Sequence, residues 1–454
     1  MSFDRRSILK LGALGAGALS FGGLTRPVLA QSEVRRRLVF AYFEGGWDIL
    51  LGLDPREPQG NDPNLTRIDP AYDQLPEPYR SRGIQTRNGL RFGPAVPTTF
   101  LAHAQDMTIV NGVGMDTAAH DAGRRYFITG RFPRGVTAVG SSAAAEIVSV
   151  QGDHTAIPHM SAGVEAYAQA LPNHASPFTV NSLADLQVAL NPIVAVEPEV
   201  VAAVRAFHDR GPSCEAERMD GTGLVTQLEE NRLRARAYLE DQLGQLFDLA
   251  RQDGEMQALR NLYGIVPGSP QDGPEVLAFV AGQALKNDLT QAVSVRVARG
   301  LDTHSNWAAD QPPRQEQGFA ALASLITDLK NAPLPEDPSR SLFEETTIVA
   351  FSEFGRTPLL NDLAGRDHHL GNSCLLAGAG IRTGRTVGAS ASVGMLPIAT
   401  DPQSGVSIER PSESQMASGA AVMMSPAHIL TTVFETAGLS TDILRSTSIS
   451  ALMS

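Results

Sequence analysis

Residues that could bind a metal ion occur in short groups along this chain, and two of the groups share one spacing. Asp302 and His304 are two residues apart, and so are Asp367 and His369, with His368 between them. On an extended segment, residues two apart project from the same side, so each Asp-x-His pair could offer two ligands, while His368 points the other way. Histidine and carboxylate together suit zinc, manganese or iron better than calcium, which prefers oxygen ligands. A single Asp-x-His is more often an ordinary turn, so this prediction depends on several groups meeting.

Five short apolar runs must position these and the other polar groups. They are Leu38–Phe43, Met107–Val110, Ala292–Val297, Thr347–Phe351 and Ser373–Ala377. Runs this short and apolar are typical of buried strands in a parallel sheet that is covered by helices. Polar groups follow four of the runs, and the group around Asp367 precedes the fifth. Because ligands bind at the carboxyl ends of parallel strands, we expect the groups to converge there, with the fifth folding over that edge as a loop.

Helical patterns lie between the apolar runs. Phe319, Leu322, Ile326 and Leu329 have the spacing of a buried helix face, and a longer helix is expected at roughly Leu224–Arg251. Alternating strands and helices predict an α/β fold with a mainly parallel sheet. We expect one domain over residues 31–454 with a helical insertion at about 195–290; a separate helical subdomain is the alternative.

The first thirty residues have the pattern of an export signal. Arg5-Arg6 precedes an apolar run from Leu11 to Leu24, and Ala30 provides a small residue for cleavage. The arginine pair predicts the twin-arginine pathway, so we expect a periplasmic or secreted protein that uses the twin-arginine export machinery. The apolar run is too short to span a bilayer, and no later segment is apolar enough for a stable membrane span.

The charge of the chain excludes some classes of partner. The formal net charge is −12 at pH 7, and removal of the basic signal leaves a still more acidic protein. An acidic surface argues against binding of nucleic acid or of anionic lipid.

Two cysteines, Cys214 and Cys374, remain after the signal. They could pair in an oxidising compartment, and two buried unpaired thiols are the alternative. Their spacing does not resemble a zinc-thiolate site.

Four motifs spread over residues 38–390 resemble the bacterial exported family known as domain of unknown function 1501. They are Glu44-Gly45-Gly46-Trp47-Asp48, Asp302-Thr303-His304, Ser352-Glu353-Phe354-Gly355-Arg356-Thr357-Pro358 and Gly365-Arg366-Asp367-His368. That family is similar to the alkaline phosphatase and sulfatase superfamily. The resemblance implies an alkaline-phosphatase-like three-layer sandwich. It also implies one or two divalent metal ions at the carboxyl ends of the strands, and hydrolysis of phosphate or sulfate esters.

The resemblance also implies metal ligands. Asp48 matches the carboxylate that follows the first strand, Asp302, His304 and His368 match one metal site, and Glu353 matches the other. Phe354 stands where the superfamily has a histidine, so the second site has lost a nitrogen ligand. Asp367 and His369 remain additional candidate ligands.

The resemblance implies catalytic residues less completely than it implies metal ligands. The segment from His120 to Gly130 resembles the sulfatase nucleophile helix, with Arg124 at the position of its arginine. His120 occupies the nucleophile position, where serine, threonine or cysteine is expected, and it could be nucleophile, metal ligand or general acid. Thr117 is the nearest preceding hydroxyl. Arg124 and Arg356 could hold a substrate oxyanion by charge-assisted hydrogen bonds.

Three functions fit these residues. The first is an exported metal-dependent hydrolase of a small-molecule or polymer phosphate or sulfate ester. The second is a non-catalytic binding or assembly protein descended from the same fold, favoured by Phe354 and by the missing hydroxyl at position 120. The third is a secreted structural protein in which the motifs only form turns.

Overall fold

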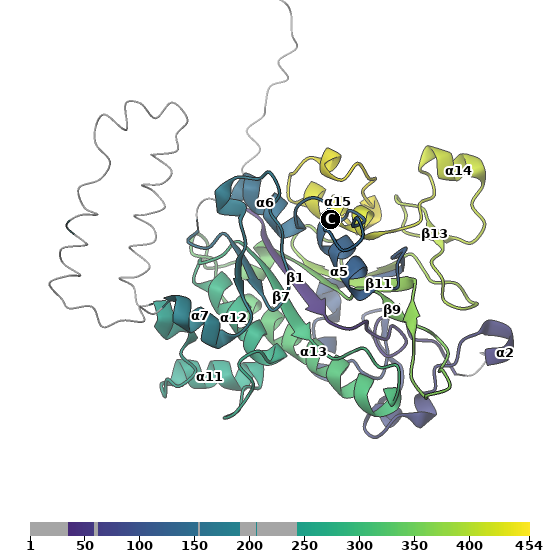
Figure 1. Ribbon diagram of the computed structural model, residues 1–454, viewed down its shortest axis with the longest axis horizontal. Coiled ribbons are helices and arrows are strands. Elements are labelled where there is room, and N and C mark those ends of the chain that lie inside the picture. The colour runs from purple at the N-terminus through teal and green to yellow at the C-terminus, as the bar shows by residue number, and fades with distance from the viewer. Residues whose placement is uncertain (1–34, 59–61, 153–154, 191–205, 207–242) are drawn as a thin grey trace, which may run out of the picture. The chain divides into compact units, whose positions relative to one another are not determined.

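The central feature of the fold is an eight-stranded sheet with the order β12-β4-β11-β8-β1-β7-β5-β6 (Figure 1). The structure is a computed structural model that describes residues 35–58, 62–152, 155–190, 206 and 243–454. The strands are β1 (Arg37–Phe43), β4 (Met107–Gly114), β5 (His159–Ala162), β6 (Phe178–Val180), β7 (Ala292–Ala298), β8 (Thr346–Phe351), β11 (Gly371–Gly378) and β12 (Arg385–Val387). Each of the five apolar runs is one of these strands, so that prediction is confirmed.

The sheet is parallel except for one strand. β11 runs antiparallel to both of its neighbours, β4 and β8, whereas every other neighbouring pair is parallel. The beginning of β11 therefore lies at the edge where the other strands end. For this reason the polar group that precedes β11 reaches the same edge as the groups that follow the other strands.

Helices cover both faces of the sheet. Alternate residues of each strand face opposite sides, so an apolar strand has two faces to bury. On β1, Val39 and Phe43 belong to the apolar cluster that includes α12 (Pro274–Lys286) and α13 (Trp307–Asn331). Phe40 and Tyr42 of the same strand belong to the opposite cluster. That cluster includes α5 (His120–Thr129), α6 (Ala143–Gln151) and α15 (Pro426–Thr436). The predicted three-layer α/β sandwich with a mainly parallel sheet is confirmed.

The remaining described elements are short. The helices are α2 (Pro63–Thr66), α3 (Tyr79–Arg82), α4 (Thr98–Leu101), α7 (Leu183–Leu190), α11 (Gly254–Tyr263) and α14 (Glu413–Ser418). Three small ribbons pair β2 (Gln85–Arg87) with β3 (Leu90–Phe92), β9 (Gly355–Arg356) with β10 (His368–His369), and β13 (Ala399–Thr400) with β14 (Ser407–Ile408). In the described part of the chain, no helix is both long and apolar enough to cross a membrane.

The two helix predictions had different outcomes. The face of Phe319, Leu322, Ile326 and Leu329 is buried in α13, as expected. The helix predicted at about Leu224–Arg251 falls largely outside the described residues, as does much of the predicted insertion at 195–290. At its described end that prediction is wrong, because a 3-10 helix stops at Phe247. There the Asp248 carboxylate accepts a hydrogen bond from the backbone N–H of Ala250 and forms a turn.

Cys374 is a buried, unpaired thiol on β11, and burial raises its pKa. Cys214 lies outside the described residues. A thiol buried in apolar surroundings is unreactive, since the thiolate is the nucleophile. In a Cys214→Ala background, we expect a thiol reagent such as dithionitrobenzoate to modify Cys374 only after unfolding. Rapid modification of the native protein would show that β11 opens readily.

Candidate functional site

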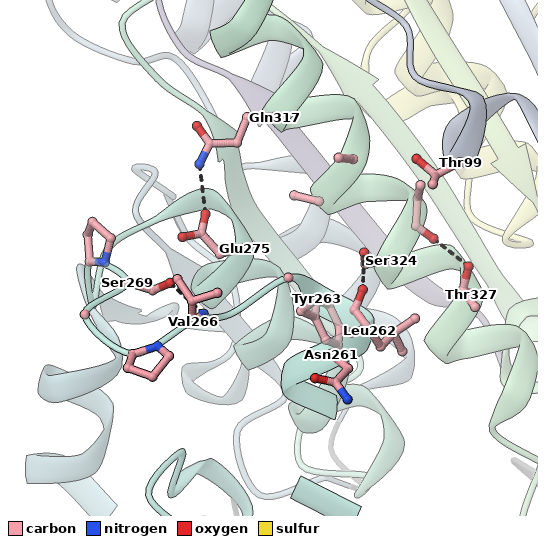
Figure 2. A pocket seen from close by; sticks show the side chains of 17 residues that line it. Thr99, Asn261, Leu262, Tyr263, Val266, Ser269, Glu275, Gln317, Ser324 and Thr327 are labelled. Atoms are coloured by element: carbon pink, nitrogen blue, oxygen red, sulfur yellow. Dashed lines mark hydrogen bonds between the residues drawn. The ribbon is translucent and has the colours of Figure 1, made fainter. Parts of the chain in front are cut away.

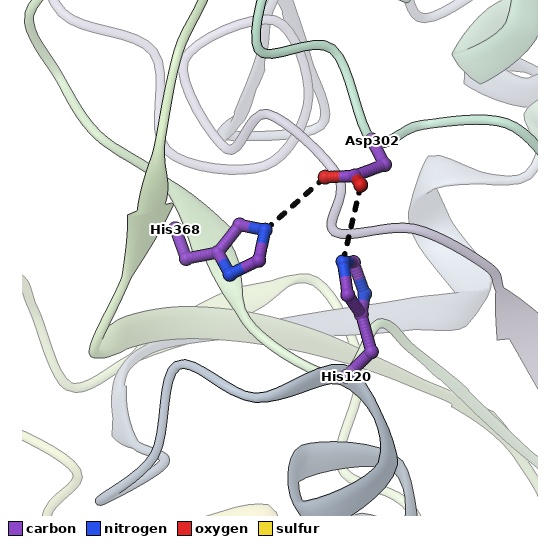
Figure 3. Close-up of side chains that lie close together, drawn as sticks. All are labelled: His120, Asp302 and His368. Atoms are coloured by element: carbon purple, nitrogen blue, oxygen red, sulfur yellow. Dashed lines mark hydrogen bonds and ion pairs between the residues drawn. The ribbon is translucent and has the colours of Figure 1, made fainter.

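Side chains from three separate segments meet at the carboxyl edge of the sheet: His120, Asp302 and His368 (Figure 3). His120 is the first residue of α5, Asp302 follows β7, and His368 lies on β10 just before β11. His120 Nε2 is 3.3 Å from Asp302 Oδ2, and His368 Nε2 is 3.1 Å from Asp302 Oδ1. The three candidate ligand atoms all lie within 4.8 Å of one another, so this group could hold a metal ion.

His304 belongs to the same cluster. Its Nε2 atom is 3.0 Å from Asp302 Oδ1 and 2.9 Å from His368 Nε2. The sequence predicted Asp302, His304 and His368 as ligands of one site, and the structure brings all of them together. We call these three residues and His120 the histidine–aspartate cluster.

The tautomer of His368 follows from its other contact. Its Nδ1 atom is 2.6 Å from the backbone carbonyl oxygen of Ala118. A carbonyl oxygen can only accept a hydrogen bond, so Nδ1 carries the proton. A neutral His368 therefore presents the lone pair of Nε2 to Asp302.

The other two histidines have a carboxylate at Nδ1. His120 Nδ1 is 2.8 Å from Glu353 Oε1, and His304 Nδ1 is 2.7 Å from Asp367 Oδ1. In each neutral imidazole this arrangement places the proton on Nδ1 and leaves Nε2 as an acceptor. An imidazole held at one nitrogen by a carboxylate or carbonyl is the usual arrangement around a metal-binding histidine.

With the imidazoles neutral, these contacts direct three Nε2 lone pairs at an ionised carboxylate. Acceptor atoms that face one another at 2.9–3.3 Å need a cation or protons between them. The donor set, nitrogen and carboxylate oxygen, is one that zinc, manganese and iron accept. The residues present therefore fit a divalent metal ion.

Close backbone packing holds the cluster in place, and two glycines permit it. Gly45 has a φ of +111°, and a Cβ there would lie 2.7 Å from the backbone nitrogen of Asp302. Its own N–H donates to Glu353 Oε1 at 2.9 Å. A Cβ at Gly365 would lie 2.0 Å from the carbonyl carbon of His304. Glycine at both positions lets the loops after β1 and before β10 lie directly against the loop that carries Asp302 and His304.

Asp302 is held in its ionised form. Partial burial by itself would raise the pKa of Asp302, but the hydrogen bond that Arg356 donates holds it well below its usual range. The Arg356 Nη2 atom is 2.6 Å from Asp302 Oδ1. Asp302 is therefore an anion at neutral pH, at the centre of the cluster.

Glu353 is an orienting group in this geometry. The hydrogen bond that His120 donates to Glu353 raises the pKa of His120. Burial by itself would raise the pKa of Glu353, but the hydrogen bond from His120 lowers it. The side chain of Glu353 is buried, and Ser352 donates to its second oxygen at 2.9 Å. The predicted ligand Glu353 thus contacts the cluster through His120.

The structure assigns Asp48 to a different place from the one predicted. Its Oδ2 atom accepts from Trp307 Nε1 at 2.8 Å and forms an ion pair with Arg366 Nε at 3.0 Å. Its Oδ1 atom accepts from the backbone N–H of Leu50 at 2.8 Å. Both side chains of the ion pair are fully buried. The structure contradicts the predicted metal role of Asp48, because Arg366, which belongs to a later motif, already neutralises the charge of its carboxylate.

The two arginines predicted to bind substrate are occupied by other groups. Arg356 is buried and donates to Asp302 and to backbone carbonyl groups. Arg124 Nε is 2.8 Å from Glu165 Oε1, and Arg124 Nη2 is 2.8 Å from Asp121 Oδ1. These internal contacts argue against the predicted oxyanion-binding role of both residues.

Thr117 and His369 also differ from expectation. The Thr117 hydroxyl accepts from the N–H of Ala119 at 3.1 Å and forms the turn before α5. The His369 Nδ1 atom is 3.1 Å from the backbone nitrogen of Gly371. Asp367 and His369 therefore do not form one ligand pair, since Asp367 instead contacts His304. This exchange of partners has no signal in the local sequence. Ala118 has none either, because it contributes a backbone carbonyl, which the residue type does not reveal.

The Asp367→Asn substitution tests the orienting role at Asp367. We expect the metal affinity to fall about 10- to 100-fold while the stoichiometry stays unchanged, as for other groups that orient a ligand. The Asp367 side chain is 52% exposed, so the fold should tolerate the change. Isothermal titration with Zn²⁺ measures the effect, and Asp362→Asn, an exposed aspartate in the same loop, is the control. An unchanged affinity in Asp367→Asn would contradict the orienting role.

A separate groove of about 710 Å³ lies between α11, α13 and the loop that follows α11 (Figure 2). Among the residues that line it, Glu275 is the only carboxylate, and Gln317 donates to it at 3.0 Å. None of the histidine–aspartate cluster lines this groove.

Comparison with known proteins gives a family and a distant structural likeness. The profile of the family described as "Protein of unknown function (DUF1501)" matches residues 35–404. No curated protein matches the sequence. One similar solved structure is that of BT4656 in complex with its substrate D-glucosamine-2-N,6-O-disulfate, with 11% identity and a TM-score of 0.33. The alignment covers 92% of this chain and 79% of that chain.

Proposed function

The chain belongs to the DUF1501 family, and we propose that it is a metal-dependent hydrolase of phosphate or sulfate esters. The observation that carries the proposal is the convergence of three imidazole Nε2 atoms on Asp302. The Nδ1 atom of each imidazole faces an oxygen acceptor. The motifs that resemble the alkaline phosphatase and sulfatase superfamily support the same reaction class.

The histidine–aspartate cluster would hold the metal through His120, His304, His368 and Asp302. A divalent metal bound there would supply Lewis-acid chemistry to an ester oxygen and to water. Glu353 and Asp367 would fix the tautomers of two ligands, and Arg356 would keep Asp302 ionised. Since the hydroxyl of Thr117 is held in a turn, we propose water as the attacking group.

Metal analysis of the purified protein tests the first step of this proposal. We expect zinc, manganese or iron in a stoichiometric amount, removable by a chelator. Hydrolysis of p-nitrophenyl phosphate or sulfate that stops with chelator and returns with metal would support the hydrolase. Protein that carries no such metal and takes up none would refute the metal site.

A non-catalytic binding or assembly protein is the second candidate. It is favoured by the internal contacts of Arg124 and Arg356, which leave neither guanidinium free for an ester oxyanion. Full metal occupancy without turnover of aryl phosphates or sulfates would support this alternative. Chelator-sensitive turnover would refute it.

We also propose export by the twin-arginine pathway, on the basis of Arg5-Arg6 and the apolar run that follows. Replacing both arginines by lysine should retain the full-length chain in the cytoplasm, and cell fractionation measures this. Normal export of the double variant would point to the general secretory route.

A further inference from the structure

The charges around the cluster do not balance while its histidines are neutral and no cation is bound. Three carboxylates, from Asp302, Glu353 and Asp367, contact the histidines directly. One guanidinium, that of Arg356, contacts Asp302. With the imidazoles neutral, two negative charges remain, and a single divalent ion would neutralise them. A second divalent ion would leave an excess of two positive charges.

Arg356 is held in place beside Asp302 and is buried. Its side chain has no solvent exposure, and its Nη2 atom is 2.6 Å from Asp302 Oδ1. Nε donates to the carbonyl of Gly46 at 3.1 Å, and Nη1 donates to the carbonyl of Arg366 at 3.0 Å. Nη2 also donates to the carbonyl of Gly45. Backbone groups from two loops therefore hold the positive charge in place.

Two carboxylates that could hold a second ion, Glu353 and Asp48, are already bound. Glu353 Oε1 contacts His120 and the N–H of Gly45, and its Oε2 accepts from Ser352. Asp48 is neutralised by Arg366 in a fully buried ion pair. A second metal would have to displace these partners and also approach the guanidinium of Arg356.

We propose that the site binds one divalent metal ion and that the guanidinium of Arg356 takes the place of a second cation beside Asp302. This inference rests on the proposed metal site and adds its stoichiometry and the role of Arg356. Arg356 is a positioning residue in this account: it holds Asp302 in place, and its charge repels a second ion.

Metal counting on the wild-type protein tests the proposal. The metal-free protein is titrated with Mn²⁺, and bound metal is measured by native mass spectrometry and electron paramagnetic resonance. We expect one Mn²⁺ per chain and the hyperfine pattern of an isolated ion. Two ions with an exchange-coupled spectrum would overturn this inference but leave the metal site standing. Binding of no Mn²⁺, Zn²⁺ or Fe²⁺ would refute the proposed site itself.

Two substitutions at Arg356 separate its charge from its shape. Arg356→Gln removes the repelling charge, and we expect Mn²⁺ to bind on the order of tenfold more tightly or a second ion to enter. Arg356→Lys keeps the charge and should bind one ion with an affinity near that of wild type. Arg366→Gln is the matched control, because it removes another fully buried arginine charge that faces Asp48.

The outcome that contradicts the role of Arg356 is an Arg356→Gln protein with wild-type affinity and one ion. Circular dichroism shows whether each variant is folded. If Arg356→Gln does not fold, the wild-type stoichiometry and spectrum still decide between one ion and two.

Discussion

Replacing Asp302 by asparagine is expected to abolish stoichiometric metal binding and any chelator-sensitive hydrolysis. The carboxylate of Asp302 is the group on which the three imidazoles converge, and Arg356 holds it ionised. Groups that only orient a ligand already contribute roughly 10- to 100-fold to metal affinity, so loss of the central anion should reduce it at least about 100-fold. Isothermal titration and metal analysis of the purified variant measure this.

Asp310→Asn is the control for Asp302→Asn. Asp310 lies near the start of α13, its side chain has a similar exposure, 36% against 45%, and its carboxylate pairs with Arg314 at 3.1 Å. We expect wild-type metal binding in this control. If Asp302→Asn retained a full complement of metal at wild-type affinity, the site would have to lie elsewhere and the proposed function would lose its main support.

The second large effect is on stability and concerns Asp48. Asp48→Asn should lower the free energy of unfolding by about 3–5 kcal/mol, because it leaves the fully buried guanidinium of Arg366 without its counter-charge. Urea unfolding followed by circular dichroism measures the change. Glu77→Gln is the control: it breaks an exposed ion pair with Arg80, and we expect little change in the free energy of unfolding.

The same Asp48 variant discriminates between two roles for this residue. With Asp48 in the buried ion pair, the folded variant should bind metal as the wild type does. Loss of metal from a folded Asp48→Asn protein would restore the ligand role that the motif resemblance implied. Combining Asp48→Asn with Arg366→Met should recover part of the lost stability, because no unpaired charge then remains in the core.

The sequence was sufficient for the fold class because strand signals are local. Each apolar run contains the residues that a buried strand needs, and the spacing of Phe319, Leu322, Ile326 and Leu329 is a helix face. Strand direction has no such local signal, since an apolar run can pair with either a parallel or an antiparallel neighbour. The reversal of β11 therefore could not be predicted, although it is what delivers His368 to the site.

The site was predictable in its residue types and less so in its pairings. The structure brings Asp302, His304 and His368 together, as expected from their types and their positions relative to the strands. Asp367 contacts His304 from 63 positions away. This pairing depends on how the loops pack, which residue types do not encode. Asp48 was predicted as a ligand because its motif matches, but in the structure its charge is neutralised by Arg366. No local sequence pattern connects Asp48 with Arg366.

The contact between His368 and the carbonyl of Ala118 joins positions 250 residues apart. A site with such contacts cannot form within a short stretch of chain. The order of folding is therefore constrained, because the sheet must form before the ligands can meet. An unfolded chain would offer only scattered histidines, which hold a metal weakly. Metal capture would then be a late event in maturation, and the compartment in which the sheet closes would determine which metal is captured.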